Sequence, residues 1–98
     1  MEVDVMDLDI LREGIDKIDQ ELVNLLEKRM QTVLEIAKYK YENKLSVLDQ
    51  NREEQVIEKN LARLKNKELS LLIEEILKTI MKSSRSYQSK FIDDQKNR

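Results

Sequence analysis

The feature that most constrains this chain is a run of apolar residues at helical spacing between about Leu8 and Tyr41. The residues follow one another in steps of three and four, with one position skipped, and an α-helix places such residues on one face. A helix of some 34 residues is about 50 Å long. The face consists of Leu8, Leu11, Ile15, Ile18, Leu22, Leu25, Val33 and Ile36.

This predicted helix is too long to be covered within its own chain. A compact globule of 98 residues has a radius of gyration of only about 13 Å. The apolar face therefore needs another chain beside it. The sequence predicts an obligate oligomer, of which a two-fold homodimer is the simplest form.

Two cations interrupt the apolar face of the long helix. Arg29 occupies the skipped position and Lys40 the next position beyond Ile36, each within about 20° of the centre of the face. Burying an unpaired charge is costly, so either carboxylates of the protein or an anionic ligand must pair with these cations. They are about 16 Å apart along the helix axis, a span that a small dianion can bridge through the two long side chains. The alternative is that both side chains snorkel to solvent.

The remaining chain predicts two shorter helices and completes an all-α fold. After a break at residues 42–48, one helix runs over about 49–64 and another from about 68 to 92. We therefore expect a single domain over residues 1–98, with a lead-in over about 1–7 and a frayed polar tail over 93–98.

The last predicted helix also turns polar along its apolar face. Ser84 stands four residues after Ile80, and Gln88 four residues after Ser84. With two cations on the first helix, these residues favour a polar pocket inside a helical bundle. Asp49 is a candidate N-cap of the second helix, with Glu53 in or near its first turn. Arg12 and Arg52, each taken alone, are compatible with surface charges.

Composition excludes several kinds of chemistry. The chain has no His and no Cys, and its net charge is −2. It therefore lacks the commonest general base and any thiol nucleophile, and it has no basic excess for nucleic acid or an anionic membrane. No carboxylate cluster has the spacing of metal ligands. No apolar run has the length of a membrane span or the form of a signal peptide, so we expect a cytoplasmic protein.

Several short motifs follow one another in an order that resembles the all-helical (type II) chorismate mutases, over about residues 8 to 91. The specific part of the resemblance is the ordered set of polar residues rather than any single motif. Leu48 departs from the pattern, because some family members carry a further Arg there. The motifs are Leu11-Arg12-Glu13, Ile18-Asp19, Leu25-Leu26-Glu27-Lys28-Arg29, Ile36-Ala37-Lys38-Tyr39-Lys40, Asp49-Gln50-Asn51-Arg52-Glu53 and Ser84-Arg85-Ser86-Tyr87-Gln88.

The resemblance implies an intertwined homodimer of three-helix subunits that rearranges chorismate to prephenate in aromatic amino acid biosynthesis. No cofactor and no proton transfer enter this reaction, so a protein without His or Cys can catalyse it. By the same resemblance, Arg29, Arg52 and Ser84 bind substrate carboxylates, and Arg12 reaches into the site of the other subunit. A guanidinium group suits this role because it binds a carboxylate through two parallel hydrogen bonds.

The resemblance also assigns the remaining polar residues. Lys40 bridges a carboxylate and the ether oxygen, Gln88 donates to the same oxygen, and Asp49 and Glu53 accept from the ring hydroxyl. Two other functions stay open. One is an isochorismate pyruvate lyase, which shares the fold and much of the pocket and is expected to differ in the segment 42–48. The other is a non-catalytic dimerisation or regulatory bundle.

Overall fold

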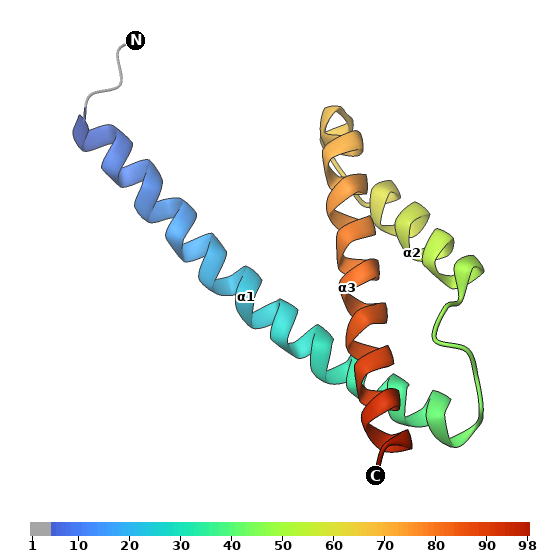
Figure 1. Ribbon diagram of the computed structural model, residues 1–98. Helices are drawn as coiled ribbons and strands as arrows, with labels where there is room; N and C mark the ends of the chain where they lie inside the picture. Colours follow the sequence, from blue (N-terminus) through green and yellow to red (C-terminus); the bar gives the residue numbers. More distant parts are fainter. Residues whose placement is uncertain (1–4) are drawn as a thin grey trace. The chain divides into compact units, whose positions relative to one another are not determined.

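The computed structural model of the protein describes residues 5–98, with side chains from Asp7 onward. Over these residues the chain forms three α-helices and one 3₁₀ turn, and no strand. The prediction of an all-α chain with one very long helix is confirmed. The elements are α1 (Val5–Glu42), α2 (Gln50–Ala62), η1 (Lys67–Leu69) and α3 (Ser70–Lys96) (Figure 1).

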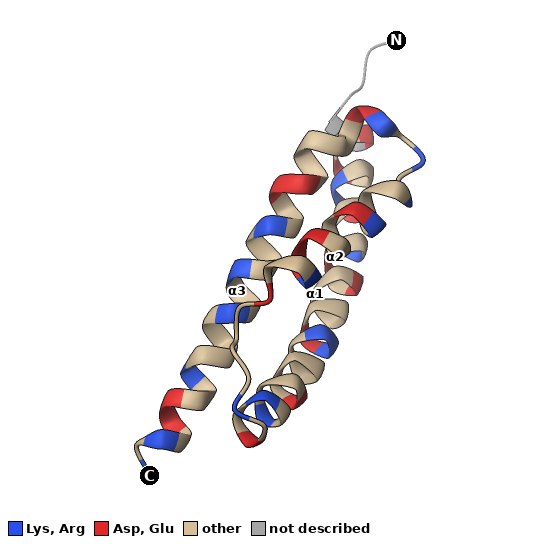
Figure 2. Ribbon diagram, turned by 90° about the vertical axis from the view of Figure 1, so that its right-hand side faces the viewer, with Lys and Arg blue, Asp and Glu red and all other residues tan. Residues whose placement is uncertain are grey.

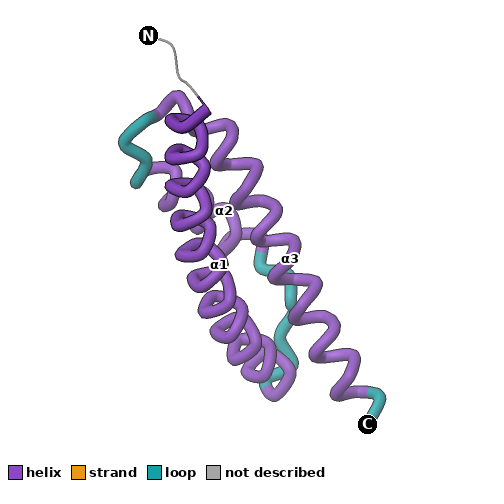
Figure 3. The backbone as a smooth tube through the Cα atoms, turned by 90° about the vertical axis from the view of Figure 1, so that its left-hand side faces the viewer, coloured by secondary structure: helices purple, strands orange, loops and turns teal. Residues whose placement is uncertain are grey.

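The chain divides into two compact units, Met1–Thr32 and Val33–Arg98. Over its described residues, the first unit is the N-terminal part of α1 alone. The second unit comprises the end of α1, a loop, α2, η1 and α3. Figure 3 shows a long loop between α1 and α2 and a short connection between α2 and α3.

The apolar face predicted for the long helix is exposed in the first unit. Leu11, Ile15, Ile18 and Leu25 each expose between 57% and 61% of their surface. These positions lie on one side of a helix because they are four, three and seven residues apart, and seven residues make about two helical turns. A single chain thus presents a continuous row of large apolar side chains to solvent.

The second unit has a small core to which α1 and α3 contribute. Val33 and Ala37 of α1 are buried, Ala37 completely, and Met81 is buried on α3. Two polar residues of α3, Ser84 and Gln88, are buried with them. Helices α2 and α3 are in contact and run in opposite directions (Figure 1). This arrangement brings the start of α2 towards the C-terminal half of α3.

The first helix begins earlier than the sequence predicts. Residues 5–7 were expected in a lead-in, but α1 starts at Val5, and Asp7 lies in its first turn. A carboxylate in the first turn interacts favourably with the helix dipole, which explains the early start. The rest of the predicted lead-in, residues 1–4, lies outside the described part of the chain.

The last helix ends later than predicted. Where the sequence suggested an end at Ile92 and a frayed tail over 93–98, α3 continues to Lys96, and the backbone N–H of Asn97 caps it by donating to Asp93. No Pro or Gly interrupts this segment, and Lys96 in the last turn interacts favourably with the helix dipole. Helix α2 ends at Ala62, two residues before the predicted end, with Arg63 as its C-cap.

Candidate active site

The end of α1 directs the chain towards the start of α2. The backbone N–H of Leu45 donates to the carbonyl of Lys40 at 2.8 Å, and that of Lys44 donates to Tyr41 at 3.4 Å. Lys44 has a φ of 56°. These are the hydrogen bonds and the left-handed residue of a Schellman motif. The left-handed conformation costs a residue with a Cβ about 1–2 kcal/mol, so Lys44 adopts it here because the turn requires it.

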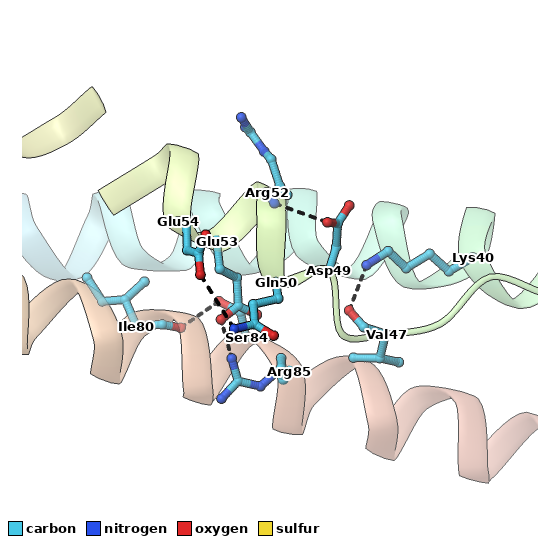
Figure 4. A network of polar contacts seen from close by, with 10 residues as sticks. All are labelled: Lys40, Val47, Asp49, Gln50, Arg52, Glu53, Glu54, Ile80, Ser84 and Arg85. Carbon is cyan, nitrogen blue, oxygen red and sulfur yellow. Dashed lines mark hydrogen bonds and ion pairs between the residues drawn. The ribbon is translucent and has the colours of Figure 1, made fainter. Parts of the chain in front are cut away.

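Lys40 reaches from α1 across this loop. Its Nζ donates to the carbonyl oxygen of Val47 at 2.8 Å in a partly buried setting (Figure 4). Within residues 7–98, no Asp or Glu oxygen forms an ion pair with Lys40. An ammonium group has three donors, so two remain for a ligand. The charge is thus positioned by a neutral carbonyl rather than compensated by a carboxylate.

Helix α2 starts at Gln50, three residues beyond Val47. Asp49 is the N-cap, and its Oδ1 accepts the backbone N–H of Arg52 at 3.0 Å, as the sequence predicts. Asp49 and Arg52 are both exposed. In Figure 4 the guanidinium group of Arg52 points away from Ser84 and from the Glu53 and Arg85 side chains. Arg52, which the resemblance assigns to a substrate carboxylate, directly precedes Glu53 in the sequence, but its guanidinium group is directed outward in this chain.

Glu53 links α2 to α3 through an ion pair with Arg85. The two side chains expose 21% and 34% of their surface, respectively. Sequence reasoning did not single out Arg85. The sequence signal that could have identified Arg85 is its position directly after Ser84, inside the motif Ser84-Arg85-Ser86-Tyr87-Gln88. Pairing between residues on two helices depends on how these helices pack, which no local spacing specifies.

Ser84 and Gln88 lie one turn apart on the same face of α3, and both are buried. The Ser84 hydroxyl donates to the carbonyl of Ile80 at 2.7 Å. The Oε1 atom of Gln88 is buried and accepts no hydrogen bond from any residue that the structure describes. An unsatisfied buried polar atom costs about 1–3 kcal/mol, so this position favours a further hydrogen-bond donor, such as a bound ligand or an ordered water.

The middle of α3 adds positive charge to this region. Between Glu75 and Asp93 the helix carries only cations among its charged residues, as Figure 2 shows. The four cations are Lys78, Lys82, Arg85 and Lys90. Lys78 pairs with Glu74 at 3.6 Å and Arg85 pairs with Glu53, so within the described residues Lys82 and Lys90 are the two of these cations that form no ion pair. Such uncompensated positive charge raises the local concentration of anions. The positive charge of α3 therefore favours an anionic ligand in the second unit, which also holds the polar cluster of Lys40, Asp49, Glu53, Ser84 and Gln88.

The two remaining predicted residues lie in the first unit, on α1. Arg12 is exposed, and its Nη1 lies 4.0 Å from Oδ1 of Asp9, with 70% and 62% of the two side chains exposed. An exposed pair of this kind contributes little to stability, so Arg12 remains available for another partner. Arg29 is half-buried. The chain thus gathers Lys40, Asp49, Glu53, Ser84 and Gln88 in its second unit, while Arg12 and Arg29 belong to the first.

The described residues contain no group of three or more His, Cys, Asp or Glu side chains that could hold a metal ion. None of the helices in the described part of the chain is long and apolar enough to cross a membrane.

Comparison with known proteins identifies one family. A family model described as chorismate mutase type II matches residues 11–89. That range includes every residue of the polar cluster and also Arg12 and Arg29. No curated protein sequence and no solved structure shows a significant match to the chain.

Proposed function

We propose that this chain, which belongs to the chorismate mutase type II family, rearranges chorismate to prephenate as a step of aromatic amino acid biosynthesis in the cytoplasm. The observation that carries the proposal is the state of Lys40, whose ammonium group is positioned by the Val47 carbonyl and by no carboxylate in residues 7–98. Such a cation is ready to bind a substrate anion without first breaking an ion pair.

The reaction is a concerted shift in which the ether C–O bond breaks while a C–C bond forms. Because no proton or covalent intermediate is involved, catalysis depends on conformation and electrostatics alone. Lys40 would stabilise the negative charge that develops on the ether oxygen. Gln88 would donate its amide N–H to the same oxygen from a buried position, where a hydrogen bond is electrostatically stronger than in water.

Substrate carboxylates require further donors. Ser84 can serve one by rotating its hydroxyl away from the carbonyl of Ile80, to which it now donates. Arg52 points outward in the free chain, so binding would require its flexible side chain to swing towards the cluster. Arg29 on α1 would bind a carboxylate through its guanidinium fork.

The ring hydroxyl of chorismate needs an acceptor. Asp49 uses Oδ1 as the helix cap, which leaves its second oxygen available. Glu53 pairs with Arg85 through Oε1 and keeps its Oε2 for another partner. A carboxylate has about four lone-pair sites, so both residues can accept from a hydroxyl while they keep their present contacts.

The exposed apolar face of α1 supports a homodimer as the active form. Leu11, Ile15, Ile18 and Leu25 are more than half exposed, and fully burying one such side chain stabilises a protein by about 1.5–3 kcal/mol. A second copy of α1 supplies a matching face by two-fold symmetry. In this dimer we propose that Arg12 of one subunit completes the site of the other.

An absorbance assay with chorismate tests the proposed reaction, and a second assay with isochorismate distinguishes the sister enzyme. We expect the purified protein to convert chorismate to prephenate and to release little pyruvate from isochorismate. Pyruvate release from isochorismate without prephenate formation would assign the chain as the lyase. A folded protein inactive on both compounds would be a non-catalytic bundle.

A further inference from the structure

The ion pair between Glu53 and Arg85 lies inside the proposed site rather than on the outer surface. Glu53 is in the first turn of α2, and Arg85 directly follows the buried Ser84 on α3. Figure 4 shows the Arg85 guanidinium directed towards the Glu53 carboxylate, next to Ser84. Both side chains are partly shielded from water, Glu53 to the greater extent.

This pair changes what Glu53 can do. A lone carboxylate close to a dianionic substrate repels it, and the repulsion grows when water is partly excluded. Arg85 offsets this charge and holds one oxygen, Oε1, through a charge-assisted hydrogen bond. The carboxylate is then restricted in orientation, because one of its oxygens is tied to α3. Its Oε2 remains as an acceptor.

We propose that Arg85 is a positioning residue that holds Glu53 so that its Oε2 accepts the hydrogen bond of the substrate's ring hydroxyl. The inference deepens the proposed function and rests on it. Arg85 itself contacts neither the substrate nor the reacting atoms, and it acts only through Glu53. It therefore makes the enzyme selective for a ring that carries the hydroxyl group.

A purely structural link between α2 and α3 would have a different signature. Loss of such a link weakens the site as a whole and slows every substrate equally. Loss of a positioning residue falls mainly on the interaction that it controls, so it slows the substrate that makes this interaction more than one that does not. A substrate without the ring hydroxyl therefore separates the two roles, because the rearrangement itself does not involve that group.

The test compares Arg85→Gln with wild type on chorismate and on an analogue that lacks the ring hydroxyl. The analogue is measured by turnover or, if turnover is too slow, by competitive inhibition. Losing one hydrogen bond to a charged group weakens binding by about 10- to 100-fold. We therefore expect the kcat/KM of Arg85→Gln for chorismate to fall by that factor. For the analogue we expect a clearly smaller loss, limited to the repulsion by the Glu53 carboxylate that Arg85 no longer offsets. Arg63→Gln is the matched control, since Arg63 is an exposed arginine at the end of α2 whose side chain donates to Oδ1 of Asn60 at 3.2 Å.

A double substitution gives a second readout. In a Glu53→Gln background, Arg85→Gln should cause no further loss beyond about twofold, because both substitutions remove the same interaction. If Arg85→Gln does not fold, Arg85→Lys replaces it in the test. This variant keeps the positive charge beside Glu53 but loses the guanidinium geometry, so we expect a smaller loss that is confined to chorismate.

Three results would overturn the inference. Equal losses on both substrates would make Arg85 a structural link, and unchanged kinetics on both would remove it from the site. Additive losses in the double variant would show that Arg85 acts independently of Glu53. A wild-type protein that forms no prephenate from chorismate would instead overturn the proposed function, and this inference with it.

Discussion

The ammonium group of Lys40 donates a hydrogen bond of 2.8 Å to the carbonyl oxygen of Val47. The Schellman turn at the end of α1 determines this contact, because it turns the backbone after Lys44 and leads it back past the Lys40 side chain. The cation is held in place without an opposing carboxylate from residues 7–98. Its position is thereby preorganised for a negative charge that appears only when substrate binds and reacts.

Replacing Lys40 by Ala should abolish most of the activity. Removing one preorganised electrostatic donor costs about 10²–10³ in kcat, and we expect at least that loss. Lys38→Ala is the control, because Lys38 lies on the same helix and pairs at the surface with Glu35 at 3.7 Å. Steady-state kinetics with chorismate, together with circular dichroism to verify folding, make the measurement. Near-native turnover by a folded Lys40→Ala protein would show that Lys40 is structural.

The exposed face of α1 should be the dimer interface. We expect sedimentation to show a dimer for the wild type, and we expect Ile18→Asp to shift it to monomer or to unfold it, because a buried unpaired carboxylate is costly. Asn24→Asp is the control, a substitution at an exposed polar position of the same helix. A wild-type monomer that is stable and active would reject the dimer and the role proposed for Arg12.

Mixing two inactive variants should restore activity if Arg12 serves the opposite subunit. Arg12→Ala and Lys40→Ala chains should each be nearly inactive. A mixed dimer then has one site with both substitutions and one with neither, so activity should reappear after the subunits exchange. If heterodimers form and no activity returns, Arg12 belongs to its own subunit's site or to no site.

Replacing Gln88 by Glu should make the reaction depend on pH. A protonated carboxyl group can donate the hydrogen bond that the amide gave, whereas an ionised one repels the developing negative charge. Lys40 would lower the pKa of the introduced carboxyl group, while burial at this position and the substrate dianion would raise it. We expect the second pair of effects to prevail in the complex, so that the protonated, active form is lost as pH rises.

The variant should therefore be poor at about pH 8 and recover towards about pH 5, whereas kcat/KM of the wild type should vary little between about pH 6 and 9. The measurement is kcat/KM across this range for both proteins. A flat profile for Gln88→Glu, or an optimum in alkali, would show that this side chain does not face the ether oxygen.

Periodicity alone predicted much of the molecule. Steps of three and four residues indicated the long helix, and they placed Ser84 and Gln88 on one face of the last helix, where both are buried. Asp49 was recognisable as an N-cap because the signal is local, spanning only three residues to the N–H of Arg52. Helix faces and caps depend on neighbouring residues, which a sequence displays directly.

Other features depended on how the helices pack. The pairing of Glu53 with Arg85 joins residues on two helices, so no local spacing indicates it. The outward direction of Arg52 and the contact of Lys40 with the Val47 carbonyl are decided by the loop between α1 and α2. The sequence by itself determined which residues share a helix face. Only the tertiary structure decided which of these faces and side chains meet, because contacts between distant segments arise from packing rather than from helical period.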